Sequence, residues 1–339
     1  MKTNTFRMVL LSAVLVSGVG QAQNKTYDLK LLPENVHWGY YDARVKPVLR
    51  VSSGDTVRVE TMLARGVERL RLAGLKDEEI PASLKAVDQA VQERGPGAHP
   101  LTGPIYVDGA EAGDTLEVHI QSFEFLHPYG VGGFIPGGGT LPEEFPYAKT
   151  KLVRVDEKAG TGQFASNITL KLAPFFGSIG VAPPQMMGRI SSGPPGPHAG
   201  NMDNKELVAG AILYLPVHVP GALLSMGDGH GVQGDGEVSL TALETSLRGT
   251  IQVFVRKGKK ITWPRAETPA HYITMGLHED LDQAAKIATH EMIEYLVAER
   301  GMSREDAYIL CSLAVDLHVT QLVDQTKGVH AMLPKSIFK

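Results

Sequence analysis

Short segments with alternating apolar and polar side chains dominate the chain from about residue 25 to 265. The run 56–60 follows the turn residues Gly54 and Asp55, and the run 115–120 follows a second Gly-Asp pair. A period of two is typical of strands with one buried face, and Gly-Asp pairs are typical of turns. We therefore predict a β-rich body of the sandwich or barrel-like type.

The C-terminal part follows a different pattern. Near residues 279–299 the apolar side chains return at i, i+3 and i+4, which is typical of an amphipathic helix. These side chains are Leu281, Ala284, Ala285, Ala288, Met292, Tyr295 and Leu296. Gly301 is expected to end the helix.

Ser303 is expected to begin a second helix, with Asp306 completing a capping box. Its apolar face contains the single cysteine of the chain, Cys311, together with Ala307, Leu310 and Ala314. We expect this cysteine to be a core residue, because it lies on the inward face of the helix.

Residues 319–323 alternate like a strand after the second helix. The whole pattern predicts a β-rich body over 23–265 and an α+β section over 266–339 that packs on it. The fold class is therefore mainly β with a C-terminal α+β section.

The first residues have the features of a secretory signal peptide. Lys2 and Arg7 precede an apolar run from Met8 to Val19, which is too short to span a bilayer. The small residues Gly20 and Ala22 then form the pattern of a cleavage site. We predict a signal peptide over 1–22, cleavage before Gln23, and an exported protein that is periplasmic or secreted. No membrane contact is expected after cleavage.

Composition excludes several classes of function. The net charge is −4, so there is no electrostatic argument for binding nucleic acid or an anionic membrane. The hydrophobic fraction of 43% excludes a disordered chain. A single cysteine excludes an intramolecular disulfide and a thiolate zinc cluster.

The densest group of polar side chains lies between residues 227 and 237, where glycines separate them. The group consists of Asp228, His230, Gln233, Asp235 and Glu237. Carboxylates with a neutral imidazole suit Zn²⁺ or another divalent cation, and glycine lets the backbone approach a ligand closely. The alternative is a glycine-rich turn with solvated charges.

Two further segments contribute candidates. The loop 193–203 is rich in Gly and Pro, and its polar side chains are His198, Asn201 and Asp203. Long ordered loops are often functional, although a plain surface loop has the same composition. His99 precedes the predicted strand 115–120. It would belong to the candidate site only if the fold brought it together with Asp228 and His230.

The motifs around these residues resemble those of the acetamidase/formamidase family. The main segment is 220–238, with the sequence PGALLSMGDGHGVQGDGEV, and residues 99–114 resemble the family's TGP…GA…GD segment. Further similar segments are 177–184, 199–203, 264–276 and 328–335. The resemblance covers about residues 27–339, in the family's order.

The resemblance implies hydrolysis of the C–N bond of small amides such as formamide or acetamide, with release of ammonia and a carboxylate. It also implies a β-rich fold with an α/β C-terminal part, a homo-oligomer, and a divalent metal, commonly zinc. The signal peptide is unlike cytoplasmic members, and His198-Ala199-Gly200 stands where His-Gly-Gly is expected. A different amide or a lactam is therefore an alternative substrate.

The residue types suggest roles for the candidates. Asp228, His230 and Asp203 are the predicted metal ligands, and Asp235 or Glu237 is the predicted base that takes a proton from water. Spacing does not separate ligand from base among the carboxylates. We expect the remaining candidates to contact the small amide substrate: His198, Asn201, Gln233 and His99.

A non-catalytic exported binding protein on the same fold is the second hypothesis. Retention of the whole acidic and histidine motif favours the enzyme, because a silent relative would lose these residues without unfolding.

Overall fold

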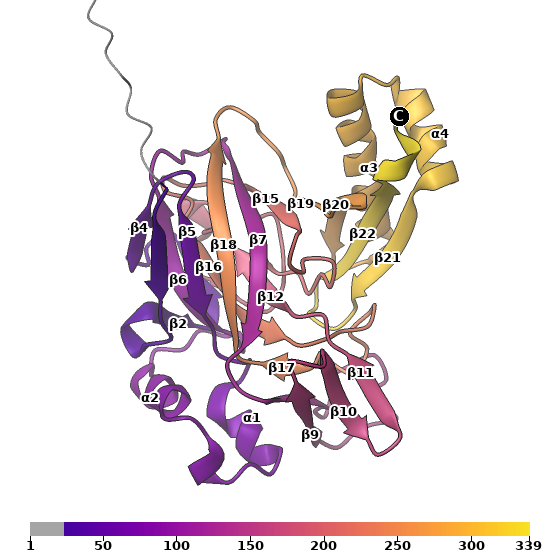
Figure 1. The fold of residues 1–339 in the computed structure, drawn as a ribbon. Coiled ribbons are helices and arrows are strands. Elements are labelled where there is room, and N and C mark those ends of the chain that lie inside the picture. The colour runs from indigo at the N-terminus through magenta and orange to yellow at the C-terminus, as the bar shows by residue number, and fades with distance from the viewer. Residues whose placement is uncertain (1–23) are drawn as a thin grey trace, which may run out of the picture.

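The computed structural model describes residues 24–339, so the predicted signal peptide at 1–22 lies outside the described residues. Two large sheets make up most of the structure (Figure 1). The first has nine strands, antiparallel except for the pair β1 and β5. In spatial order they are β1 (Thr26–Leu29), β5 (Thr56–Glu60), β18 (Leu247–Arg256), β7 (Thr115–Phe125), β15 (Ile212–Pro216), β19 (Arg265–Glu267), β20 (His271–His278), β22 (Lys327–Pro334) and β21 (Asp316–Gln321).

The second sheet has eleven strands and carries most of the candidate site. Its main path is β11 (Ile168–Lys171), β10 (Thr161–Ala165), β9 (Lys149–Asp156), β8 (Tyr129–Phe134), β17 (Glu244–Thr245), β16 (Leu224–His230), β12 (Phe175–Gly180) and β14 (Ala199–Asn201). Strand β6 (Pro100–Val107) pairs with β16, and also with β2 (Val36–Trp38) and β4 (Leu49–Val51). A separate ribbon joins β3 (Tyr40–Tyr41) to β13 (Ile190–Ser191).

The largest hydrophobic core contains side chains from both sheets. The nine-stranded sheet contributes residues such as Val57, Val118 and Leu213, and the eleven-stranded sheet contributes Ile105, Phe176 and Met226. Sheets that bury one face against each other in this way form a sandwich. The predicted mainly β class is therefore confirmed, and within residues 24–339 neither large sheet closes into a barrel.

Two short helices in the body were missed by the sequence pattern. They are α1 (Gly66–Leu72) and α2 (Ala82–Ala90), which share a second core with Trp38. In α2 only Leu84 and Val87 are buried, so its apolar face is too short to give a helical period. Four short 3₁₀ turns complete the elements: η1 (Pro33–Asn35), η2 (Asp77–Glu79), η3 (Gln185–Met187) and η4 (Lys335–Ile337).

The two predicted C-terminal helices are confirmed as α3 (Leu281–Arg300) and α4 (Arg304–Ala314). Gly301 ends α3 in the left-handed region with φ 64°, and the Ser303 side chain accepts a hydrogen bond from the Asp306 amide. Both helices share a core with β22, and Figure 1 shows them together at one end of the molecule.

The predicted C-terminal section begins within the nine-stranded sheet. Strands β19 to β22 extend the nine-stranded sheet of the body, and the predicted strand at 319–323 is β21, which ends at Gln321. The division at residue 265 stays a prediction. Cys311 is buried as expected, and burial raises the pKa of its thiol, which opposes a nucleophilic role.

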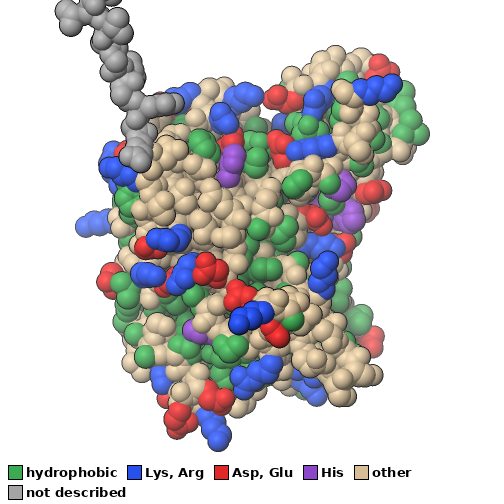
Figure 2. Space-filling model, viewed as in Figure 1, with side chains coloured by type: hydrophobic (Ala, Val, Ile, Leu, Met, Phe, Trp, Pro, Cys, Tyr) green, Lys and Arg blue, Asp and Glu red, His purple; other side chains and the backbone are tan. Residues whose placement is uncertain are grey.

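No helix among residues 24–339 is both long and apolar enough to cross a membrane. Basic and acidic side chains are interspersed on the face in Figure 2, so this face has no extended patch of one charge.

Candidate active site

Strand β16 places Asp228 and His230 inside the eleven-stranded sheet. The two residues are separated by one position, the spacing that puts side chains on the same face of a strand. Their neighbour Gly229 faces strand β17, where an added Cβ would lie 2.6 Å from the Thr245 carbonyl oxygen. Only a glycine at position 229 therefore allows the two strands to approach so closely. The side chains of Asp228 and His230 point to the opposite face of β16.

His230 is completely buried among acidic groups. Its Nε2 lies 3.2 Å from Asp228 Oδ2 and 3.6 Å from Glu244 Oε1, and its Nδ1 lies 3.8 Å from Asp203 Oδ1. Glu244 begins β17, and Asp203 follows β14. Two strands and one loop thus converge on a single imidazole.

A hydrogen-bond chain sets the tautomer of this imidazole. Gln233 Nε2 donates to the Asp203 carbonyl oxygen at 2.7 Å, so its Oε1 faces His230 Nδ1 at 3.0 Å. The imidazole Nδ1 therefore carries the donated proton, and a neutral ring turns its Nε2 lone pair toward Asp228 and Glu244. A lone pair that faces two carboxylates requires either a second proton on the ring, at Nε2, or a cation between the imidazole and the carboxylates of Asp228 and Glu244.

Asn201, Asp203 and Asp324 form the next layer. The Asn201 amide donates to Asp203 Oδ2 at 2.9 Å and to Asp324 Oδ2 at 3.1 Å. Asp324 lies in the turn between β21 and β22, so the C-terminal strands contribute to the site. Ligand oxygens of Asp203, Glu237 and Asp324 lie within 4.8 Å of one another, and Glu237 is equally close to His230 and Glu244.

A cavity of about 210 Å³ opens over this cluster. Its wall includes His99 and Asn201 as well as the carboxylates, and Arg69 lies at its side with Nη1 3.4 Å from Glu244 Oε2. The volume is several times the roughly 30 Å³ that one water occupies in the liquid, so a small organic molecule fits.

The backbone is strained around the cluster. Asp203, Asp228 and Glu237 have φ of 50°, 55° and 45°, a region that residues with a Cβ rarely adopt. Such conformations cost about 1–3 kcal/mol each and gather at functional sites.

Burial and mutual repulsion shift the pKa values of the acids. The pKa values of Asp203 and Glu237 are raised well above the usual range, chiefly by burial and then by neighbouring carboxylates. Burial also raises the pKa of Asp324 to about 6. Burial opposes charge on His230, but Asp228 and Glu244 prevail and raise its pKa. Burial also opposes charge on Asp228 and so favours a higher pKa, but the charges of His230 and His99 outweigh burial and lower the pKa of this carboxyl.

The donor set fits a divalent cation. Within the described chain, Asp203 Oδ1, Asp228 Oδ1 and His230 Nε2 are buried and have no hydrogen-bond partner. Ligand atoms of these three residues lie within 4.8 Å of one another. Carboxylate oxygens with one imidazole suit zinc and similar ions, and such an ion would offset the repulsion between the acids.

Most predicted site residues come together. Besides Asp203, Asp228, His230 and Glu237, the cluster includes Gln233 and Asn201 through the hydrogen bonds above. His99 approaches from the start of β6. Its Nδ1 lies 3.0 Å from the Ser192 carbonyl oxygen, and its Nε2 lies 3.9 Å from Asp228 Oδ2.

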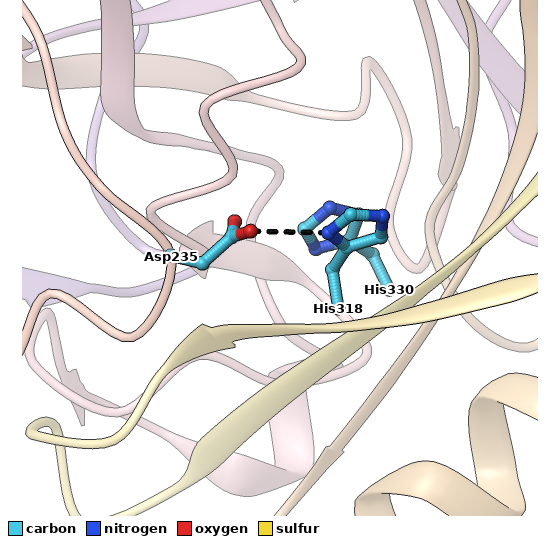
Figure 3. Close-up of side chains that lie close together, drawn as sticks. All are labelled: Asp235, His318 and His330. Carbon is cyan, nitrogen blue, oxygen red and sulfur yellow. Dashed lines mark hydrogen bonds and ion pairs between the residues drawn. The ribbon is translucent and has the colours of Figure 1, made fainter.

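Two predicted residues lie elsewhere. His198 is buried with its ring edge-on to Tyr41 at 5.0 Å, and burial lowers its pKa to about 3. Asp235 does not join the ligand groups of the cluster and lies beside His318 and His330 instead (Figure 3). The reason is that residues 231–243 form a loop, in which a spacing of two does not fix a common face.

Glu244, Asp324 and Arg69 were missed by the sequence analysis. Glu244 lies in a stretch that mixes apolar and hydroxyl side chains, without another acid or a histidine near it, and Asp324 lies far along the chain in the tail. Neither residue has a spacing from Asp228 or His230 that would predict its place in the cluster.

The profile of the Acetamidase/Formamidase family matches residues 33–193 and 188–339. The chain belongs to this family. The match includes every residue of the cluster described above, from His99 to Asp324.

Individual members of the family agree with this assignment. The crystal structure of an acetamidase from Bacillus halodurans superposes with a TM-score of 0.77 at 33% identity, covering 93% of this chain and 98% of that one. A formamidase of Methylophilus methylotrophus is 27% identical over 86% of this chain and 87% of its own length. A Schizosaccharomyces pombe relative with a formamidase name is 27% identical, and the match spans 61% of each chain.

Proposed function

We propose that this protein hydrolyses the C–N bond of small linear amides of the formamide and acetamide type, releasing ammonia and a carboxylate. The observation that carries the proposal is a cavity in a member of this family that is lined by five carboxylates, those of Asp203, Asp228, Glu237, Glu244 and Asp324. The His230 imidazole is buried beneath it, with ligand atoms close to the first four. Relatives named formamidase and acetamidase support the substrate class.

The polar groups of the cavity match those of a primary amide. The substrate amide has N–H donors that need acceptors. Asn201 Oδ1 is buried without a partner among the described residues, and His99 Nε2 is free to accept when Nδ1 donates to Ser192. These two atoms are suited to orient the leaving nitrogen.

We assign the proton transfers to Glu237. Its carboxylate approaches Asp203, His230 and Glu244, so it reaches the centre of the cluster from the glycine-rich loop. In this role it takes a proton from the attacking water and returns it to the departing nitrogen, because ammonia leaves far more readily than an amide anion. Asp235, the other candidate base, receives no catalytic role.

We assign Asp203, Asp228 and His230 as the metal ligands. A divalent cation held there, with zinc the best match to the donors, would polarise the substrate carbonyl and lower the pKa of a bound water. The hydrogen bond from His230 Nδ1 to Gln233 then orients the imidazole for this ligand role.

Ammonia release tests the proposed reaction. The purified protein is expected to release ammonia from formamide or acetamide, and prior treatment with a chelator is expected to lower the rate until Zn²⁺ is restored. Glu237→Gln should reduce the rate by at least about a hundredfold, the usual loss for a general base. Glu299→Gln, at an exposed position of α3, serves as the matched control.

The alternatives give different results. A non-catalytic binding protein would bind an amide without producing ammonia. A lactam hydrolase would open 2-pyrrolidinone to the amino acid and leave formamide and acetamide intact. Either result would contradict the proposed function, and an unchanged rate after complete metal removal would contradict the ligand assignment.

We also propose that the protein is exported. Lys2, Arg7 and the apolar run 8–19 support this, with the small residues that end at Ala22. N-terminal sequencing of the protein from fractions of its native host is expected to give a start near Gln23 outside the cytoplasm. A chain beginning at Met1 in the cytosolic fraction would contradict export.

A further inference from the structure

A second group of ligand-type side chains lies outside the catalytic cluster. It consists of Asp235 on the glycine-rich loop, His318 on β21 and His330 on β22 (Figure 3). Potential ligand atoms of the three residues lie within 4.8 Å of one another. None of them lines the cavity over the catalytic cluster.

Strand pairing brings the two imidazoles together. His318 and His330 are direct partners in the antiparallel pair β21–β22, and their rings are stacked with centroids 5.1 Å apart and an interplanar angle of 11°. Figure 3 shows both rings on the side of the strands that faces Asp235. The backbone register therefore fixes the histidine pair before any ligand binds.

The spacing of the ligand atoms is that of a metal site. His318 Nδ1 lies 3.0 Å from Asp235 Oδ2. Two ligands bound tetrahedrally to one zinc ion at about 2.0 Å lie roughly 3.3 Å apart, so this pair needs little movement.

His330 provides an independent observation. Its side chain is fully buried, its Nδ1 is 2.8 Å from Thr320 Oγ1, and its Nε2 has no hydrogen-bond partner within residues 24–339. A metal-binding histidine is commonly oriented by a hydrogen bond from its other ring nitrogen to an oxygen, and the Thr320 hydroxyl is placed to accept such a bond.

We propose that Asp235, His318 and His330 bind Zn²⁺ at a second site, separate from the catalytic cluster. Two imidazoles and one carboxylate are ligands that suit zinc rather than the oxygen-seeking Mg²⁺ or Ca²⁺. Asp235 is exposed and His318 is half-buried, so an ion reaches the site from solvent. The Lys205 ammonium lies 3.0 Å from the other carboxylate oxygen, Oδ1, which leaves Oδ2 for the metal.

The role of this ion is to hold the glycine-rich loop. The loop already touches β21 through the Gly236 amide, 3.2 Å from the Thr320 carbonyl oxygen, and through the Leu322 amide, 3.1 Å from the Gly236 carbonyl oxygen. A metal bound by Asp235 and both imidazoles would also tie the loop to β22 through His330, next to Glu237. The site is therefore structural, and it supports the loop without touching the substrate.

Zinc binding to the chelator-stripped protein tests the proposal. Calorimetric titration with Zn²⁺ is expected to show two classes of site, and His318→Ala is expected to weaken one of them by at least about tenfold. This variant changes a half-buried side chain, so the fold should persist. The matched control is His290→Ala, which removes an exposed imidazole 3.6 Å from a Glu294 oxygen.

Asp228→Asn separates the two sites. It is expected to weaken the other class of zinc site and to leave the class that depends on His318 unchanged. Equal zinc stoichiometry and affinity in His318→Ala and His290→Ala would overturn the proposal, whatever the amide hydrolysis shows. Loss of all zinc in Asp228→Asn alone would overturn it as well.

Discussion

An alanine in place of Gly177 is expected to reduce amide hydrolysis by at least about a hundredfold, the loss that a displacement of roughly 1 Å causes in a catalytic group. Gly177 lies on β12, beside the cluster. An added Cβ would lie 2.5 Å from Asp203 Oδ1 and 2.6 Å from both Asp228 Oδ2 and His230 Cε1. The methyl group would therefore displace all three proposed metal ligands. Ammonia release and bound metal are the measurements.

Only space makes this substitution harmful, since Gly177 is not among the residues with positive φ. Overpacking of this kind costs about 1–3 kcal/mol of stability, so the fold should persist. The matched control is Gly132→Ala on strand β8, where the nearest atom to an added Cβ is the Ala242 carbonyl oxygen at 3.5 Å. Activity of Gly177→Ala equal to that of the control would contradict the site as we describe it.

Replacing His230 with alanine should also lower amide hydrolysis by at least a hundredfold, roughly what the loss of an essential catalytic group costs. The imidazole lies 3.2 Å from Asp228 and 3.6 Å from Glu244. Within the described residues, three groups of potential ligands contain Asp203, Glu237 or Glu244, and His230 is the only basic side chain in these groups. Removing it takes away a proposed metal ligand and the imidazole nearest to the buried carboxylates of Asp203 and Asp228. Bound metal and ammonia release should fall together.

Breaking a buried ion pair costs about 3–5 kcal/mol, so the thermal midpoint of this variant must be measured as well. His230→Gln keeps an amide donor in the same space and is the second variant if alanine prevents folding. His290→Ala again controls for loss of an imidazole. Wild-type metal content and nearly wild-type rates in a folded His230 variant would move the site to the loop from His198 to Asp203.

Local patterns in the sequence predicted the parts of the site that local geometry controls. Asp228 and His230 share a face because they lie two positions apart on a strand, and the glycine between them allows close strand packing. The caps of α3 and α4 followed from Ser303 and Gly301 for the same reason. In each case the chemistry of a few adjacent residues decides the outcome.

The remainder depends on contacts between distant segments. Asp324 reaches the cluster because β21 and β22 join the body's sheet, and Glu244 reaches it because β17 pairs with β16. Asp235 was misplaced because the loop bends at Glu237, whose φ is 45°, and the Gly236 backbone pairs with β21. Tertiary pairing, and not spacing, decides which face these acids occupy.

The left-handed backbone at Asp203, Asp228 and Glu237 has a consequence for laboratory evolution of this protein. A glycine at any of these positions would relieve the strain and remove a buried acid, so the chain would gain stability as it lost its chemistry. Selection for heat resistance alone would therefore enrich inactive variants. A screen that scores turnover before thermal tolerance avoids this outcome, and it directs improvements to surfaces away from the cluster.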